Sequence, residues 1–188
     1  MTRSSRKTAR PVAFAADGHD HMSCIAEALQ RAVALCESRG TQLTELRRRV
    51  LELVWSSHEP IGAYRILEQL DRPLPGQMRG KARRAAPPTV YRALDFLIEQ
   101  GLVHRIESLN AFVGCDQPQA THAGQFMICG HCGVALELND AGIANALASC
   151  ATRLGFKVER PTIEVRGICP NCVRSGATQP AHAEHRHG

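Results

Sequence analysis

The 188-residue sequence predicts an α+β fold in two parts. Apolar residues recur at helical spacing through the first hundred residues, and short alternating segments typical of strands follow them. Two Cys-x-x-Cys pairs lie in the second half of the chain, where they can clamp the ends of a small subdomain. This order favours a helical module with a β-hairpin, followed by a smaller α/β unit held by metal.

The first 21 residues are expected to form a disordered leader. The stretch 11–16 (PVAFAA) is too short for the apolar core of a signal peptide and begins with proline. No run approaches the length of a transmembrane helix. We therefore expect a cytoplasmic protein with reduced cysteines.

Three helices are predicted before residue 71. The first spans Cys24–Arg39 and stops at Gly40, the second begins after Thr44, and the third follows Gly62. Their apolar stripes should face a common core: Ile25, Leu29, Val33 and Cys36, then Leu46, Val50, Leu53 and Val54, then Ile66, Leu67 and Leu70.

Residues 71–86 are predicted to form a basic loop, because their prolines and glycines exclude a helix. The loop carries five basic residues against Asp71 alone. Arg83 and Arg84 are candidate contacts to DNA phosphates, and a solvated insertion that touches nothing is the alternative.

A fourth helix is predicted from Pro87 to about Gln100, with Gly101 as its stop. Its buried stripe is Val90, Leu94, Leu97 and Ile98, while Thr89, Tyr91, Arg92 and Asp95 lie away from it. The segments 102–107 and 111–115 suit a β-hairpin. Helices followed by a hairpin form a winged helix-turn-helix, with the fourth helix in the major groove. A generic helical domain is the alternative.

The net charge of +5 lies entirely in the first half. Residues 1–101 carry 16 Lys/Arg against 11 Asp/Glu, whereas residues 102–188 carry 7 of each. This asymmetry favours a nucleic-acid-binding module joined to a neutral partner domain.

The second half is predicted to hold an α/β unit. Strands are expected at 126–128, 134–138 and 162–165, with a helix between the last two that Asn139 or Asp140 caps and Gly155 ends. On that helix Ile143, Leu147, Cys150 and Leu154 share a face, and Cys150, like Cys36, is predicted to be a core residue. An exposed strand edge could pair with a second copy, which predicts a homodimer.

The pairs Cys129–Cys132 and Cys169–Cys172 predict a structural zinc site. Four thiolates can surround one zinc ion tetrahedrally, and a two-residue spacing lets one turn present both sulfurs of a pair. Two disulfides are the alternative, and they require an oxidising compartment.

The run 86–94 (APPTVYRAL), followed by 99–103 (EQGLV), resembles the recognition-helix signature of the ferric uptake regulator family. Both cysteine pairs occur where that family holds its structural zinc. The resemblance runs from about Ile25 to Cys172 and is closest to the family's zinc uptake regulators. It implies a homodimeric, metal-activated repressor of zinc-uptake genes that binds double-stranded operator DNA and is not an enzyme, with neither a membrane nor a small-molecule substrate as partner. The expected domains are a leader at 1–21, a winged-helix domain at 22–115, a hinge at 116–124, a dimerisation domain at 125–173, and a disordered histidine-containing tail at 174–188.

The resemblance also implies a regulatory zinc near the hinge, so that each subunit binds two Zn(II) ions. The matching positions are His104, Cys115, His122 and Glu137. Their N/S/N/O donor set suits zinc, and the thiolate argues against ferrous iron. A metal held between the domains would favour one interdomain orientation. Expected DNA contacts are Tyr64, Thr89, Tyr91 and Arg92.

Other functions stay open at this point. A family member that senses iron, manganese or peroxide is the nearest alternative, and a zinc storage or delivery protein is more distant. A zinc hydrolase would need an open coordination position and a general base. The four-cysteine set is closed, and the sequence contains no H-E-x-x-H motif.

Overall fold

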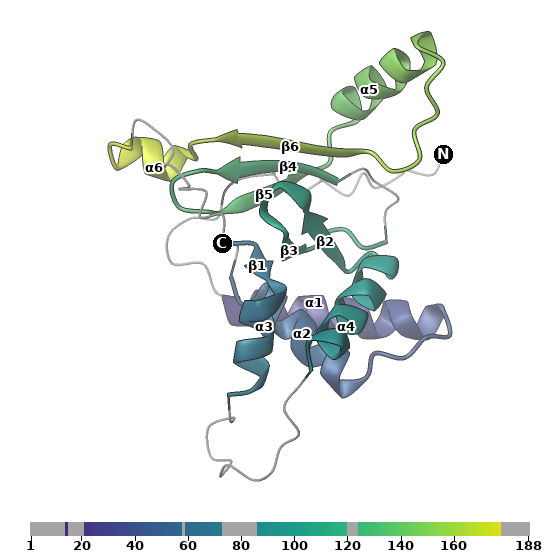
Figure 1. The fold of residues 1–188 in the computed structure, drawn as a ribbon, viewed down its shortest axis with the longest axis vertical. Helices are drawn as coiled ribbons and strands as arrows, with labels where there is room; N and C mark the ends of the chain where they lie inside the picture. Colours follow the sequence, from purple (N-terminus) through teal and green to yellow (C-terminus); the bar gives the residue numbers. More distant parts are fainter. Residues whose placement is uncertain (1–13, 15–20, 58, 73–85, 120–123, 178–188) are drawn as a thin grey trace, which may run out of the picture.

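The structure is a computed structural model that describes residues 14, 21–57, 59–72, 86–119 and 124–177. Helices and strands are mixed along the chain, as the α+β prediction expected, and the strands form two separate three-stranded sheets. Figure 1 shows the helical part at one end, one sheet in the middle, and the other sheet across it. None of the described helices has both the length and the apolar character needed to cross a membrane.

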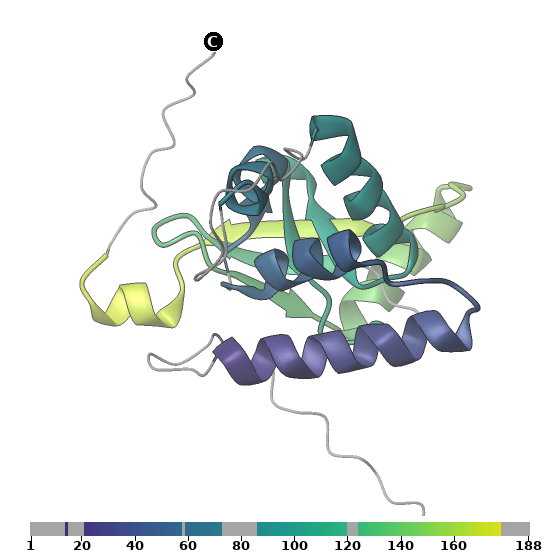
Figure 2. The same ribbon diagram turned by 90° about the horizontal axis from the view of Figure 1, so that it is seen from below.

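Four helices form the N-terminal part. They are α1 (His21–Ser38), α2 (Glu45–Trp55), α3 (Ala63–Leu70) and α4 (Pro87–Glu99). Gly101 follows α4 with a φ of +69°, a backbone conformation that glycine adopts without strain, so it ends the helix as predicted. In Figure 2 α1 lies beside α2 along one side of the molecule.

The helices share one apolar core. The apolar stripes of α2, α3 and α4 face this core as predicted, and Val50, Ile66 and Leu94 are fully buried in it. The stripe of α1 differs from the prediction, because the face that packs inward is centred on Ala28, Ala32, Leu35 and Cys36 while Val33 is 42% exposed. The small alanine side chains allow α1 to lie close to the other helices. A prediction from the spacing of large apolar residues does not show that alanines form the buried face.

The first sheet, called the hairpin sheet here, has the order β1-β3-β2. Strands β2 (Val103–Ile106) and β3 (Ala111–Gly114) form the predicted antiparallel hairpin, with His104 opposite Val113. A 3-10 turn, η1 (Glu107–Leu109), connects them, and Asn110 closes it in the left-handed conformation. The short strand β1 (Ile61–Gly62) pairs with the outer side of β3.

The second sheet has the order β5-β4-β6. Strand β4 (Gly124–Cys129) lies in the centre, antiparallel to β5 (Ala135–Leu138) and parallel to β6 (Thr162–Gly167). Helix α5 (Ala141–Arg153) makes the connection from β5 to β6, and the short helix α6 (Pro170–Arg174) follows β6. Asp140 caps α5 by accepting a hydrogen bond of 3.0 Å from the backbone N–H of Ile143.

Helix α5 projects away from the rest of the chain (Figure 1). Its predicted apolar face exists but is not covered by the residues that the structure describes, since Ile143 and Leu147 are each 37% exposed and Leu154 is 77% exposed. The prediction that Cys150 is a core residue is therefore wrong, because Cys150 is exposed on this face, whereas Cys36 is buried as predicted. Helical periodicity identifies an apolar face but does not say what covers it.

The two sheets pack against each other through a small apolar cluster. Ile106 and Val113 of the hairpin sheet meet Phe126, Ile128 and Ala135 of the second sheet, and Ile106 and Phe126 are almost completely buried. This cluster fixes how the hairpin lies on the second sheet, and it positions the polar side chains around it.

Candidate metal centres and nucleic-acid interface

The four cysteines of the two Cys-x-x-Cys pairs lie together. Cys129 ends β4, Cys132 lies in the turn before β5, and Cys169 and Cys172 lie at the start of α6. Their sulfur atoms all lie within 4.8 Å of one another, and the Cys129–Cys172 and Cys132–Cys169 sulfur pairs are each 3.8 Å apart. All four cysteines are free thiols, which rules out the alternative of two disulfides in this structure.

This arrangement fits a tetrahedral zinc ion. Zinc–sulfur bonds of about 2.3 Å place the sulfurs of a regular tetrahedron about 3.8 Å apart, which is the separation found. Backbone N–H groups support the sulfurs, since Cys169 N–H donates to Cys129 Sγ at 3.3 Å and Cys172 N–H to Cys169 Sγ at 3.5 Å. Burial raises the pKa of Cys129, but N–H donors from Cys132, Cys169 and His131 outweigh burial and lower it to about 6.

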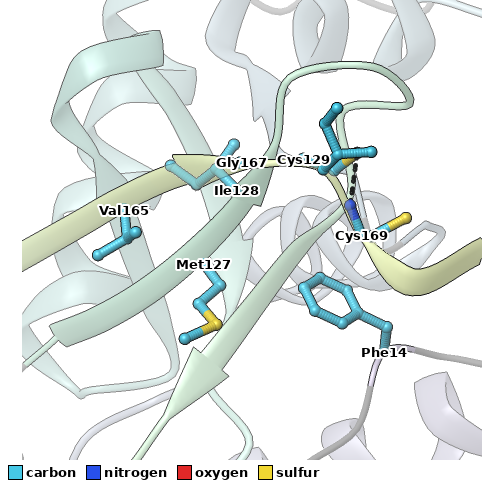
Figure 3. A pocket seen from close by; sticks show the side chains of 8 residues that line it. Phe14, Met127, Ile128, Cys129, Val165, Gly167 and Cys169 are labelled. Atoms are coloured by element: carbon cyan, nitrogen blue, oxygen red, sulfur yellow. Dashed lines mark hydrogen bonds between the residues drawn. The ribbon is translucent and has the colours of Figure 1, made fainter. Parts of the chain in front are cut away.

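An apolar hollow adjoins the cysteine cluster on one face of the second sheet. Figure 3 shows Met127 and Val165 lining it beside Cys129 and Cys169, with the ring of Phe14 at its mouth. Phe14 packs against the cysteine cluster although it belongs to the N-terminal stretch. The Phe14 side chain therefore covers part of the cysteine cluster on this side.

A second cluster lies between the two sheets. His104 on β2, Cys115 directly after β3, and Glu137 on β5 bring their donor atoms within 4.8 Å of one another. His104 Nε2 is 2.7 Å from Glu137 Oε1, and the other carboxylate oxygen of Glu137 accepts a 3.1 Å hydrogen bond from the N–H of Asp116. Three of the four predicted regulatory ligands are thus adjacent, and His122 lies outside the described residues.

The surroundings of this cluster hold its donors in place. The His104 ring meets the edge of Phe126 with centroids 5.4 Å apart, and the N–H of Cys115 donates to the carbonyl of Leu102. Burial raises the pKa of the Cys115 thiol, and the nearby Glu137 carboxylate raises it further. One nitrogen, one sulfur and one carboxylate form a set that suits zinc.

Helix α4 presents a polar outer face. Thr89, Tyr91 and Arg92 are exposed there, on the side opposite the buried Val90 and Leu94. Tyr64, at the start of α3, is 69% exposed. The predicted DNA contacts are therefore accessible, while Arg83 and Arg84 lie outside the described residues.

The sequence and the fold are similar to those of one family of known proteins. The sequence model of the ferric uptake regulator family matches residues 38–166. The chain belongs to the ferric uptake regulator family.

Several of the similar proteins are named as zinc regulators. The chain is 38% identical over 165 residues to the zinc uptake regulation protein of Escherichia coli (strain K12), which covers 86% of this chain and 91% of that protein. A solved zinc uptake regulator in complex with zinc and DNA has a TM-score of 0.71 and 37% identity, covering 81% of this chain and 97% of that one. The crystal structure of holo XcZur has a TM-score of 0.68 and 38% identity, and the match covers 79% of this chain and 98% of that one.

One polar contact of this ferric uptake regulator family member was not predicted from the sequence. The Glu164 carboxylate on β6 accepts hydrogen bonds from the N–H groups of Glu107 and Ser108 in the hairpin turn. A glutamate in a strand is ordinarily read as a solvent-exposed residue, and the sequence carries no signal that pairs it with a turn 56 residues earlier.

Proposed function

We propose that this chain is a zinc-responsive transcriptional repressor. In this proposal it binds operator DNA as a homodimer when its second metal site holds Zn(II), and it represses zinc-uptake genes. The observation that carries the proposal is the cluster of His104, Cys115 and Glu137, whose donors come from both sheets and lie within 4.8 Å of one another. Metal bound there would couple the arrangement of the sheets to zinc supply.

The donor chemistry supports zinc at both sites, two ions per subunit. Cys129, Cys132, Cys169 and Cys172 would hold a structural ion, because four thiolates close the coordination sphere. His104, Cys115 and Glu137, with His122 from the connecting segment, would hold the regulatory ion. A thiolate ligand favours zinc over ferrous iron or manganese, and the closed four-cysteine site argues against a hydrolase.

The N-terminal part has the layout of a winged helix-turn-helix domain, which we assign to residues 22–115. Helix α3 precedes α4, and the β2–β3 hairpin would be the wing. Helix α4 is then the recognition helix, with Thr89, Tyr91 and Arg92 facing the major groove and Tyr64 contacting DNA from α3. The positive charge of the first half, with Arg83 and Arg84 as candidate phosphate contacts, supports this assignment.

Residues 125–173 would form the dimerisation domain, joined to the first through a hinge at 116–124. The apolar face of α5 is exposed within one chain, and Phe156 and Val158 after it are 68% and 37% exposed. A second copy that covered these side chains would remove a large apolar surface from water. A symmetric dimer would suit a near-palindromic operator, and a DNA-binding role implies that the protein acts in the cytoplasm.

The mechanism rests on two arrangements of the sheets, of which one is competent to bind DNA. Bound zinc would supply coordination bonds between donors of the two sheets. His104 and Cys115 then move together with Glu137, so the hairpin and the second sheet are held in one orientation. Shifting such an equilibrium from 1:99 to 99:1 requires about 5.5 kcal/mol of differential binding, which is within the range of a zinc site.

Operator binding at buffered free zinc tests this function. The DNA probe is a duplex selected by the zinc-loaded protein from a random-sequence pool. Cys115→Ser and His104→Ala should keep a folded dimer with its structural zinc but weaken zinc-dependent binding to this duplex. Cys24→Ser is the matched control, because Cys24 lies on α1 and belongs to neither cluster. A wild-type zinc response in the Cys115→Ser and His104→Ala variants would overturn the assigned site.

A further inference from the structure

Three residues of the second sheet form one row across its strands. Glu137 on β5 and Glu164 on β6 both stand opposite Phe126 on β4 in the strand register. Residues opposite one another in a sheet project from the same face. The row Glu137–Phe126–Glu164 therefore presents two carboxylates with an aromatic ring between them, and this face is the one on which the hairpin sheet packs.

Each member of the row contacts the hairpin at a different place. Glu137 meets His104 near the start of β2 and also the N–H of Asp116. Phe126 lies against the His104 ring and packs in the cluster with Ile106. Glu164 meets the turn at the far end of the hairpin. The carboxylates thus hold the two ends of the hairpin, and the apolar contact holds its middle.

The contact made by Glu164 uses both of its oxygens. Oε1 accepts the N–H of Glu107 at 2.6 Å, and Oε2 accepts the N–H of Ser108 at 3.1 Å. Hydrogen bonds to an ionised carboxylate are shorter and stronger than neutral ones, and two parallel bonds also fix direction. Burial raises the pKa of Glu164, but hydrogen bonds from Ser108 and Glu107 outweigh burial and lower it, so the charged form is the one that the turn binds.

The negative charge of Glu107 in the turn is neutralised by Arg105 of the same hairpin. The Glu107 side chain, which would otherwise repel Glu164, pairs with Arg105 at 3.2 Å. Arg105 also donates to the side-chain oxygen of Asn110 at 3.0 Å, and Asn110 closes the turn. The turn is therefore shaped to offer two N–H groups to an incoming carboxylate.

We propose that Glu164 is a positioning residue, a latch that holds the hairpin turn against the second sheet and so preorganises the ligand cluster at the other end of the row. Without Glu164 the hairpin would still be held at Glu137 and by the apolar contacts around Phe126, but its turn could tilt away from the second sheet. The attachment at Glu164 restrains the turn, and His104 and Cys115 then stay within reach of Glu137. The latch lies outside the ligand set, and its importance for gene regulation rests on the function proposed above.

The latch has a measurable effect on metal binding. When only a fraction of the protein is in the binding-competent arrangement, the apparent dissociation constant rises in inverse proportion to that fraction. Removing two charge-assisted hydrogen bonds should lower this fraction about tenfold. We therefore expect Glu164→Ala to weaken the second, regulatory zinc about tenfold while leaving the zinc of the cysteine quartet in place.

The experiment measures zinc affinity by chelator competition in Glu164→Ala, Glu164→Gln and Glu159→Gln. Glutamine keeps the shape of Glu164 but turns an NH₂ group towards one of the N–H donors, so Glu164→Gln should also weaken the second zinc. Glu159→Gln is the control, because it removes an equal charge from an exposed position of the α5–β6 connection. Equal affinities for the second zinc in all three variants would overturn the latch.

Amide hydrogen exchange gives a second readout that needs no DNA, and its wild-type measurement needs no variant. The latch predicts that the N–H groups of Glu107 and Ser108 are protected in the wild type and lose protection in Glu164→Gln. Unprotected amides at both positions in the wild type would overturn it even if the variants did not fold. The two proposals can fail separately. If the wild type has protected amides and Glu164→Ala binds the second zinc more weakly, but the zinc-loaded wild type does not bind the operator, the proposed function is rejected and the latch is retained.

Discussion

The imidazole Nε2 of His104 lies 2.7 Å from the carboxylate Oε1 of Glu137, although the two residues belong to different sheets. The sulfur of Cys115 lies within 4.8 Å of both groups. A metal ion bound by these three side chains would link the hairpin to the second sheet. The proposed response to zinc follows from this placement, because metal binding and the relative orientation of the sheets become coupled.

The cysteine quartet should contribute to folding. Cys132→Ser is expected to lose one zinc ion per subunit and to destabilise the protein strongly, because structural zinc in small domains is bound with about 10–16 kcal/mol that is coupled to folding. Zinc content and the thermal unfolding midpoint measure this, with Cys24→Ser, a cysteine of α1 outside both clusters, as the control. A variant that lost the zinc yet unfolded at the wild-type temperature would refute the structural role.

Binding of the regulatory zinc should release a proton from Cys115. Burial and then the Glu137 charge raise the pKa of this thiol, so it is protonated at neutral pH in the metal-free protein. Zinc must displace that proton, and the affinity should therefore rise about tenfold for each unit of increasing pH across the neutral range. Chelator competition at several pH values, corrected for the chelator's own titration, measures the slope. A pH-independent affinity would mean that Cys115 is not a ligand.

Arg92 should contribute to base recognition from the outer face of α4. Arg92→Ala is expected to cost about 1–3 kcal/mol in operator binding and to relax specificity at one operator position. Arg160→Ala, which removes an equal charge from an exposed position outside the helical part, is the control. Binding measured against a set of single-base operator variants decides the matter, and unchanged discrimination would reject the role of Arg92.

Gly114 should be intolerant of any side chain. A Cβ atom at this position would lie 2.2 Å from Cε2 of Trp55, a buried ring, and would force the ring or β3 to move. Gly114→Ala is expected to cost about 1–3 kcal/mol of unfolding free energy, which denaturant unfolding measures. At Gly167 a Cβ would meet nothing within 4 Å, so Gly167→Ala is the control. Equal unfolding midpoints for both variants would contradict this packing.

Local patterns predicted most of the fold. The helices ending at Ser38 and Glu99, the β2–β3 hairpin and the Asp140 cap follow from short-range periodicity and turn chemistry, which act within a few residues. The packing faces were less predictable. Val33 and Cys150 lie on apolar stripes but are exposed, because the sequence does not reveal which neighbour covers a stripe.

The sites were predictable to different degrees. The cysteine quartet follows from its spacing alone, whereas the His104–Cys115–Glu137 cluster was expected only through the family resemblance. The Glu164 contact was not expected at all, since it depends on the register between β4 and β6, which are joined through α5. Such a register follows from three-dimensional packing and leaves no local trace in the sequence.

The most direct test of the central claim is a titration that follows zinc stoichiometry and operator binding together at buffered free zinc. The account predicts two zinc ions per subunit, with operator binding rising in step with occupancy of the second ion and not of the first. A protein that bound a single zinc ion, or that bound the operator equally well before and after the second ion entered, would contradict it.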